Sequence, residues 1–253
     1  MAMELVKARL NLFAVLRNME DLAALDPETA TLTRDWNITI QFSVRGGPAA
    51  WLEFNHGACR HGTGAHPRPT VKLFFLSPAH LNRMFDGKGS PIPLKGFSRL
   101  GFLARDFPKA TQRLEHYLKP KNGLAQDPDF KRVNTTLTLY TAVHAVRELA
   151  LLDPACKKVA THTPAGVLQI SVLPDGPDVS VTIGPGAWTV AKGKAAAPTA
   201  MMTFRDMDVA HALLNNQLDS FRAVGEGKVM LRGMLPIIDN VGLILDRVAG
   251  YLT

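Results

Sequence analysis

The chain repeats one sequence pattern after about half its length. Residues 10–27 read LNLFAVLRNMEDLAALDP, and residues 137–154 read LTLYTAVHAVRELALLDP. Seven positions are identical at a constant offset of 127, among them the final Leu-Asp-Pro. A repeat of this length predicts two copies of one domain rather than a solenoid of 20–50-residue units.

Matches continue beyond the first segment. Gln41 corresponds to Gln169, and both lie within similar tetrapeptides. The Tyr-Leu pair that begins at Tyr117 recurs at Tyr251. A polar segment over residues 120–129 is typical of a linker. We therefore expect one domain over residues 1–120 and a second over residues 128–253.

Composition favours a globular protein of the cytoplasm. The 253 residues are 46% hydrophobic and 20% charged, enough for two domains with their own cores. The sequence has no apolar run of 18 residues, and its N-terminus mixes Glu4, Lys7 and Arg9 into its apolar residues, unlike a signal peptide. The two cysteines, Cys59 and Cys156, fall in different repeats, which argues against a disulfide framework and fits a reducing compartment.

Charge is divided unevenly between the repeats. The net charge is +7, and residues 1–125 hold 17 Lys and Arg against 10 Asp and Glu, whereas residues 126–253 hold 12 of each sign. A basic first half can attract phospholipid headgroups, nucleic acid or an acidic partner, or it can serve solubility alone.

Each repeat is predicted to be α/β in content, of the α+β type. The expected order of elements is a helix, three strands, a fourth strand, a short capped helix, a fifth strand and a closing helix. Asp-Pro ends the first helix. Short turns between strands imply a mainly antiparallel five-stranded sheet covered by helices on one face. The helices are expected over residues 5–25, 78–86 and 97–118, and 137–152, 207–215 and 234–252.

One segment carries a family resemblance. Residues 219–245 read DSFRAVGEGKVMLRGMLPIIDNVGLIL. This segment begins with a short helix, which leads through Gly227 into a strand of alternating basic and apolar residues. Gly233 and an apolar helix come next. The segment resembles the C-terminal half of sterol carrier protein type-2 domains. The resemblance covers most of residues 128–253 and, through the repeat, residues 5–119.

The resemblance implies an apolar tunnel that binds or transfers lipid, sterol or fatty-acyl ligands without catalysis and without a cofactor. Methionine suits such a site because its side chain is flexible and polarisable. In the second domain the resemblance points to Met202, Phe204, Leu213, Leu214, Phe221, Met230, Leu235, Ile238, Val241 and Leu245. The same residues also suit an ordinary core. The first repeat has no room for the short helix between Gly87 and Pro91, so ligand binding is expected more in the second domain than in the first, for which it stays open.

Four side chains of the first repeat, His56, Cys59, His61 and His66, have a spacing that can bind zinc. Their counterparts in the second repeat are Pro185, Trp188, Val190 and Ala195. Because the second copy is apolar there, we interpret the cluster as part of the core and predict no metal site.

A basic stripe runs along the predicted closing helix of the first repeat. Arg105, Lys109 and Arg113 recur every four residues, opposite an apolar face that includes Phe107 and Leu114. An amphipathic helix with a cationic exterior can lie on an anionic membrane, or its stripe can be ordinary solvated surface.

Catalytic signatures such as G-x-S-x-G, H-E-x-x-H or a phosphate-binding loop are absent from the sequence. The leading hypothesis is therefore a non-catalytic lipid-binding protein without a nucleic-acid partner. The competing hypotheses are a protein-interaction scaffold whose domains have lost the tunnel, and a metal- or thiol-dependent enzyme. The sequence does not predict an oligomeric state.

Overall fold

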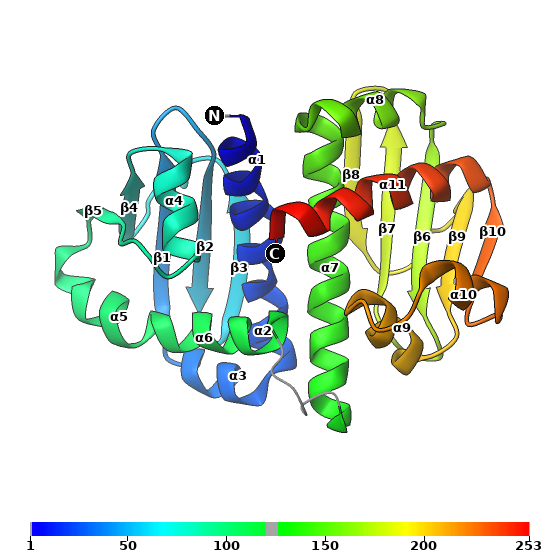
Figure 1. Ribbon diagram of the computed structural model, residues 1–253. Coiled ribbons are helices and arrows are strands. Elements are labelled where there is room, and N and C mark those ends of the chain that lie inside the picture. Colours follow the sequence, from blue (N-terminus) through cyan, green and yellow to red (C-terminus); the bar gives the residue numbers. More distant parts are fainter. Residues whose placement is uncertain (1, 120–125, 253) are drawn as a thin grey trace. The chain divides into compact units, whose positions relative to one another are not determined.

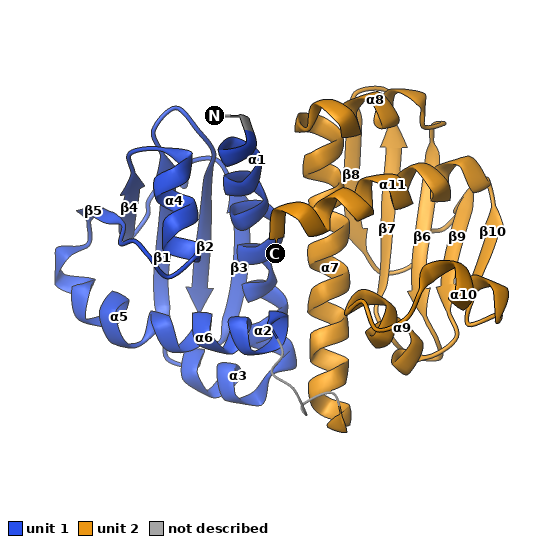
Figure 2. Cartoon of the chain, viewed as in Figure 1, with its two compact units in different colours: residues 1–121 blue, residues 122–253 orange. Residues whose placement is uncertain are grey.

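The computed structural model describes residues 2–119 and 126–252 and divides into two compact units, residues 1–121 and 122–253 (Figure 2). Residues 120–125 of the predicted linker lie outside the described residues. Its last residues are helical, because Asp127 caps a helix that begins at Pro128. The division into domains 1–120 and 128–253 stays a prediction.

Both units place their five strands and the short helix after the fourth strand in the same order, but α10 of the second unit has no counterpart among the described residues of the first (Figure 1). The first contains α1 (Ala2–Leu10), α2 (Met19–Leu25), α3 (Pro27–Thr33), β1 (Asn37–Val44), β2 (Ala49–Asn55), β3 (Ala58–Thr63), β4 (Val71–Phe75), α4 (Pro78–Phe85), β5 (Ile92–Lys95), α5 (Leu100–Arg105) and α6 (Phe107–Leu118). The second contains α7 (Pro128–Leu152), α8 (Pro154–His162), β6 (Gly166–Val172), β7 (Asp178–Gly184), β8 (Ala187–Lys192), β9 (Ala200–Phe204), α9 (Met207–Leu214), α10 (Ser220–Gly225), β10 (Val229–Gly233) and α11 (Leu235–Leu252).

The two sheets have one topology. Their strand orders are β3-β2-β1-β4-β5 and β8-β7-β6-β9-β10, and in each only the central pair, β1 with β4 and β6 with β9, is parallel. The register is also shared, since Val44 lies opposite Phe75 and Val172 lies opposite Phe204. The predicted fold, two copies of a mainly antiparallel five-stranded sheet with helices, is confirmed.

Alternating burial builds the core of each unit. Along β2 the side chains of Ala50, Leu52 and Phe54 are fully buried, whereas the residues between them are only half-buried. Period-two alternation places the buried set on one face of the sheet, where helices cover it. In the second unit that cover includes α11, which packs on β6, β9 and β10 (Figure 1).

The Asp-Pro pairs do more than end a helix. The preceding helices end at Leu25 and Leu152, as predicted, but α3 and α8 begin at once with Pro27 and Pro154. Asp26 accepts hydrogen bonds from the backbone N and the Oγ1 of Thr29, at 3.0 and 2.6 Å, so it caps the new helix. Proline at the first helical position has no N–H that needs a partner, which suits this site.

Two helices predicted as continuous are interrupted. The helix expected over residues 5–25 consists of α1, a π-helical turn, a 3₁₀ turn and α2. The helix expected over residues 97–118 is a 3₁₀ turn, then α5, then α6, which separate at Asp106. Pro108 accounts for the second break, because proline is tolerated in the first turn of a helix but not in its interior. Helix α7, in contrast, begins nine residues before the predicted start.

A buried glutamine fixes the connection between β3 and β4. Gln41 of β1 donates from Nε2 to the carbonyls of Ala50 and Gly64, at 3.0 and 3.1 Å, and its Oε1 accepts from the backbone N of His66 at 2.6 Å. Gln169 makes the matching contacts, including one from Ala195 at 2.7 Å. Each glutamine lies on the sheet face opposite the helices, and there it holds the segment that crosses from one side of the sheet to the other.

An Asp–Arg–Tyr cluster ties the closing helix to the early helices in each unit. In the first, Asp26 binds Arg113 through both oxygens, at 2.8 and 3.0 Å, and accepts from Tyr117 at 3.1 Å. In the second, Asp153 binds Arg247 at 2.9 Å and Tyr251 at 2.7 Å. Burial alone raises the pKa of Asp26, but hydrogen bonds from Arg113 and Thr29 outweigh it and lower the pKa to about 2. For Asp153 the same balance, with the backbone of Cys156, Tyr251 and Arg247 as donors, holds the pKa far below its ordinary value.

Candidate functional site

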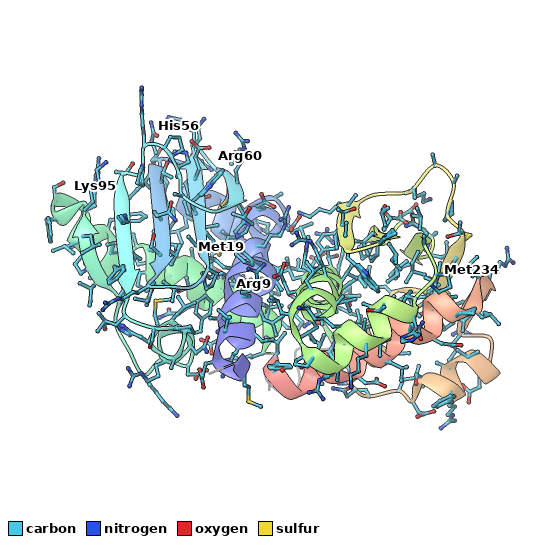
Figure 3. All side chains as sticks on the ribbon, turned by 90° about the horizontal axis from the view of Figure 1, so that it is seen from above. Arg9, Met19, His56, Arg60, Lys95 and Met234 are labelled. Atoms are coloured by element: carbon cyan, nitrogen blue, oxygen red, sulfur yellow. The ribbon has the colours of Figure 1, made fainter. Side chains whose placement is uncertain are left out.

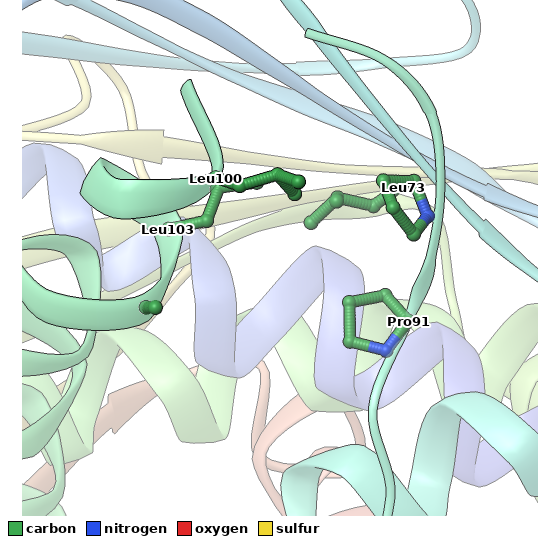
Figure 4. A pocket seen from close by; sticks show the side chains of 6 residues that line it. Leu73, Pro91, Leu100 and Leu103 are labelled. Carbon is green, nitrogen blue, oxygen red and sulfur yellow. The ribbon is translucent and has the colours of Figure 1, made fainter. Parts of the chain in front are cut away.

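An apolar pocket opens in the first unit, between the edge of the sheet and α5 (Figure 4). Its volume is about 260 Å³. The lining contains no polar side chain and comes from Leu73 of β4, from the residues Pro91 and Pro93 at β5, and from Leu100, Leu103 and Ala104 of α5. A pocket of this character can hold an apolar group and offers nothing for acid–base or nucleophilic chemistry.

Local sequence explains how this pocket forms. Strand β5 lies at the sheet edge, where prolines are tolerated because no further strand needs their N–H. Gly96 then reverses the chain with a φ of +88°, and a Cβ at this position would lie 2.9 Å from the carbonyl oxygen of Thr70. The 3₁₀ turn and α5 follow, and Leu100 and Leu103, three residues apart, share one face of the helix. That face meets Leu73 across the pocket (Figure 4).

The residues predicted to bind lipid in the second unit differ in burial. Phe204, Ile238 and Val241 are fully buried, as core residues are. Phe221 and Leu235 are 88% and 50% exposed. The remaining five are half-buried: Met202, Leu213, Leu214, Met230 and Leu245.

Strand register separates two of these residues. Met202 lies directly opposite Leu231, and Met230 directly opposite Thr203. Residues that face each other across an antiparallel pair share a sheet face, and adjacent residues on one strand lie on opposite faces. Met202 therefore lies on the face of Phe204, and Met230 lies on the other. The structure does not bring the two methionines to one apolar surface.

The predicted basic stripe is not continuous. Arg105 belongs to α5, whereas Lys109 and Arg113 belong to α6, beyond the break at Asp106. Lys109 pairs with Asp106 at 3.2 Å, and Arg113 is held by Asp26 at 2.8 Å and by Glu28 at 2.9 Å. Of the three, only Arg105 lacks a carboxylate partner among the described residues.

The His and Cys side chains of the first repeat serve separate structural contacts. His61 is buried, and its Nε2 lies 2.8 Å from the carbonyl oxygen of Leu12. His66 packs against the ring of Trp51. Burial, helped by Glu20 and Asp21, raises the pKa of the Cys59 thiol far above its ordinary value, so the thiol is not a nucleophile at neutral pH. Burial, followed by the charge of Asp153, likewise raises the pKa of Cys156 to about 11.

Within residues 2–119 and 126–252, no three His, Cys, Asp or Glu side chains come close enough together to hold a metal ion. Among the helices that the structure describes, none combines the length and apolar character that crossing a bilayer requires.

No protein-family model and no curated protein sequence matches the chain. Solved structures that resemble it include a ubiquinone synthesis protein described as UbiJ-SCP2, at 14% identity and a TM-score of 0.34, over 46% of this chain and 91% of that one. The sterol carrier protein domain 2 of Helicoverpa armigera matches at 14% identity and a TM-score of 0.35, over 45% of this chain and 89% of that domain. A Thermus thermophilus protein described as possibly a sterol carrier protein matches at 18% identity and a TM-score of 0.34, over 44% of this chain and 85% of that one.

The resemblance to sterol carrier protein type-2 domains is thus found by structure comparison as well as in the sequence. Likeness at these TM-scores assigns neither a ligand nor an activity to the chain.

Proposed function

We propose that the protein binds a lipid or fatty-acyl ligand in the cytoplasm, without catalysis. The observation that carries this proposal is the pocket bounded by Leu73, Leu100 and Leu103, which has only apolar side chains in its lining and opens to the surface. Removing an acyl chain from water is favourable by about 0.8 kcal/mol per buried CH₂ group. Such a pocket therefore supports an apolar ligand with no need for a charged anchor.

Pocket size restricts what the first unit accepts. Its volume of about 260 Å³ lies just below the range of about 300–1,000 Å³ that is typical of small-molecule sites. It suits part of an acyl chain better than a whole sterol. Leu100, at the mouth, is 43% exposed and offers further apolar contact to the part of a ligand that stays outside.

The second unit supports the same proposal less directly. Met202 of β9, Leu213 of α9 and Leu245 of α11 are half-buried, and α9 and α11 both pack on β9. A flexible methionine between packed elements allows a side chain to move aside for a ligand. We propose this region, without Met230 and the exposed Phe221, as a second place for the apolar ligand.

Filling the pocket is the direct test. Ala104 lines it and is exposed at its rim, so Ala104→Trp is expected to occupy the space without disturbing the core. We expect the dissociation constant of the full chain for a fluorescent fatty acid to rise at least about tenfold, which corresponds to about 1.4 kcal/mol. The matched control is Gln112→Trp, an exposed position of α6 that does not line the pocket.

A second measurement keeps the test independent of the probe. A ligand that binds only the folded state at 100 times its dissociation constant stabilises that state by about 2.7 kcal/mol, so palmitate is expected to raise the melting temperature. Native mass spectrometry of the purified protein should also show co-purified lipid. Equal affinity in both tryptophan variants would argue against the pocket, and the absence of any lipid-dependent shift would argue against the function.

Helix α10 favours a second candidate, a protein-interaction scaffold. Phe221 and Val224 lie on this short helix and are 88% and 42% exposed. Exposed aromatic side chains are frequent anchors of protein–protein interfaces. Phe221→Ser, which leaves the pocket of the first unit untouched, should abolish partner binding under this alternative and leave fatty-acid binding unchanged.

A further inference from the structure

The net charge of the protein is concentrated in one stretch of the first unit. Residues 54–105 contain eight Lys and Arg and a single carboxylate, that of Asp86. The rest of the chain holds 21 residues of each sign. The whole surplus of +7 therefore belongs to the part of the sequence that runs from the end of β2 to the end of α5.

Within that stretch, we call residues 88–105 the cationic–apolar segment. It includes β5, the 3₁₀ turn and α5 (Figure 1). Its apolar side chains are unusually open, with Ile92 37%, Leu94 49%, Phe97 64% and Leu100 43% exposed. Its charged side chains are exposed as well and are all basic: Lys88, Lys95, Arg99 and Arg105. Lys95 is labelled in Figure 3.

No described carboxylate neutralises these cations. Among the described residues, Lys88, Lys95, Arg99 and Arg105 form no ion pair; Lys95 donates instead to the carbonyl oxygen of Pro69, at 2.6 Å. In addition, Lys95 lies directly opposite Lys72 on β4. Like charges in directly opposed positions destabilise a sheet, so the pair costs stability unless an anion outside the chain compensates it.

We propose that the cationic–apolar segment docks the protein on an anionic lipid bilayer. Basic side chains interleaved with Phe and Leu are the composition of a surface that lies in the headgroup region, with apolar groups inserted and cations beside the phosphates. A protein partner fits less well, because charged residues are depleted from the centre of protein interfaces. Nucleic acid fits less well too, because it offers no apolar region for Leu94 and Phe97.

The cationic–apolar segment and the pocket share Leu100, which lines the pocket and is 43% exposed. The role of the docking rests on the proposed function. A pocket that opens onto a docked surface can receive an acyl chain directly from the bilayer. It relocates the membrane contact expected from the sequence, because Lys109 and Arg113 are already paired with Asp106 and Asp26.

The test is co-sedimentation of the full chain with vesicles of phosphatidylcholine alone or with about 30% phosphatidylserine, an anionic lipid of the kind that attracts basic segments. Each basic residue near such a surface contributes about 1 kcal/mol, which is about a fivefold change in binding. Lys88→Glu/Arg99→Glu reverses two charges that do not line the pocket, so we expect binding to the anionic vesicles to fall at least about a hundredfold. Phe97→Ser is expected to weaken binding at high salt, where the electrostatic part is screened.

The matched control is Lys109→Glu/Lys119→Glu, which changes the net charge equally on exposed positions of the same unit. We expect it to bind close to wild type. An equal loss in both double variants would reduce the effect to net charge and overturn the assignment. Binding to poly-glutamate but to neither vesicle would assign the segment to an acidic protein and also overturn it.

Fatty-acid titration separates this proposal from the proposed function. Lys88→Glu/Arg99→Glu should bind the fluorescent fatty acid as tightly as wild type. If the fatty acid binds and the anionic vesicles do not, docking is wrong and the pocket stands. If the vesicles bind and no fatty acid does, the pocket is wrong and docking stands.

Discussion

Replacing Arg113 by alanine is expected to lower the free energy of unfolding of the first unit by about 3 kcal/mol. Arg113 binds both oxygens of Asp26, whose side chain is only 3% exposed. Without the guanidinium, the carboxylate stays buried, and its remaining partners among the described residues are Thr29 and Tyr117. Removing one partner of a buried ion pair costs about 3–5 kcal/mol, and the low end applies because Arg113 itself is 23% exposed.

The measurement is urea denaturation followed by the fluorescence of Trp36 and Trp51 in a Trp188→Phe background, so that only the first unit is observed. The control is Lys109→Ala on the same helix, whose pairing with Asp106 is exposed and is worth less than about 1 kcal/mol. Equal effects of the two changes would mean that Arg113 is ordinary surface. Arg247→Ala should cost less than Arg113→Ala, because Arg247 is more exposed.

The pH dependence of the free energy of unfolding tests the same cluster. The pKa of Asp26 is about 2 in the folded chain, compared with an ordinary value of 3.8. The stability that Asp26 contributes is therefore complete above about pH 4, and it is lost as the pH falls toward 2. The difference between wild type and Arg113→Ala should shrink over the same interval. A difference that persists at about pH 2 would contradict an electrostatic origin.

Replacing Gly233 by alanine is expected to destabilise the second unit by about 3 kcal/mol. Gly233 is the last residue of β10 and has a φ of +83°, and a Cβ there would lie 2.2 Å from the carbonyl oxygen of Thr199. That oxygen cannot move freely, since it accepts a hydrogen bond from the backbone N of Met234 at 2.9 Å. Backbone strain of about 1–2 kcal/mol therefore adds to a clash of about 1–3 kcal/mol.

The matched control is Gly227→Ala. Gly227 also has a positive φ, +67°, but no atom lies within 4 Å of a Cβ built there. It should show the strain alone, about 1–2 kcal/mol. The fluorescence of Trp188 in a Trp36→Phe/Trp51→Phe background reports on the second unit. If both glycine variants lose the same stability, the close approach of Thr199 carries no cost.

The repeated residues allowed the fold to be predicted but not all of its contacts. Asp26 and Tyr117 stood out because both recur in the second copy, and the structure joins them in one cluster. Arg113 has its counterpart in Arg247, yet a spacing of four placed it with Arg105 and Lys109 on a predicted surface stripe. The partner of Arg113 is Asp26, and only the packing of α6 against α3 identifies it. Periodicity within one helix contains no information about a contact 87 residues away.

The pocket was missed for a related reason. A single helix over residues 97–118 would carry Leu100 and Leu103 away from β4, and Pro108 was the available signal that the helix breaks. The missing short helix between Gly87 and Pro91 favoured a ligand in the second unit instead. There, Met202 and Met230 are separated by strand register, which follows from pairing between strands rather than from composition.

The buried amides of Gln41 and Gln169 have a practical consequence for anyone who inserts a tag or a fluorophore. The crossing segments near residues 64–70 and 193–199 have neither helix nor strand and would ordinarily be chosen for an insertion. Each segment is nevertheless held to the sheet by a glutamine amide, which donates a hydrogen bond to the backbone of the segment and accepts one from it. Gly46 and Gly186 lie in exposed turns between strands, and a Cβ built at either would meet no atom within 4 Å, so these turns are the better places to lengthen the chain.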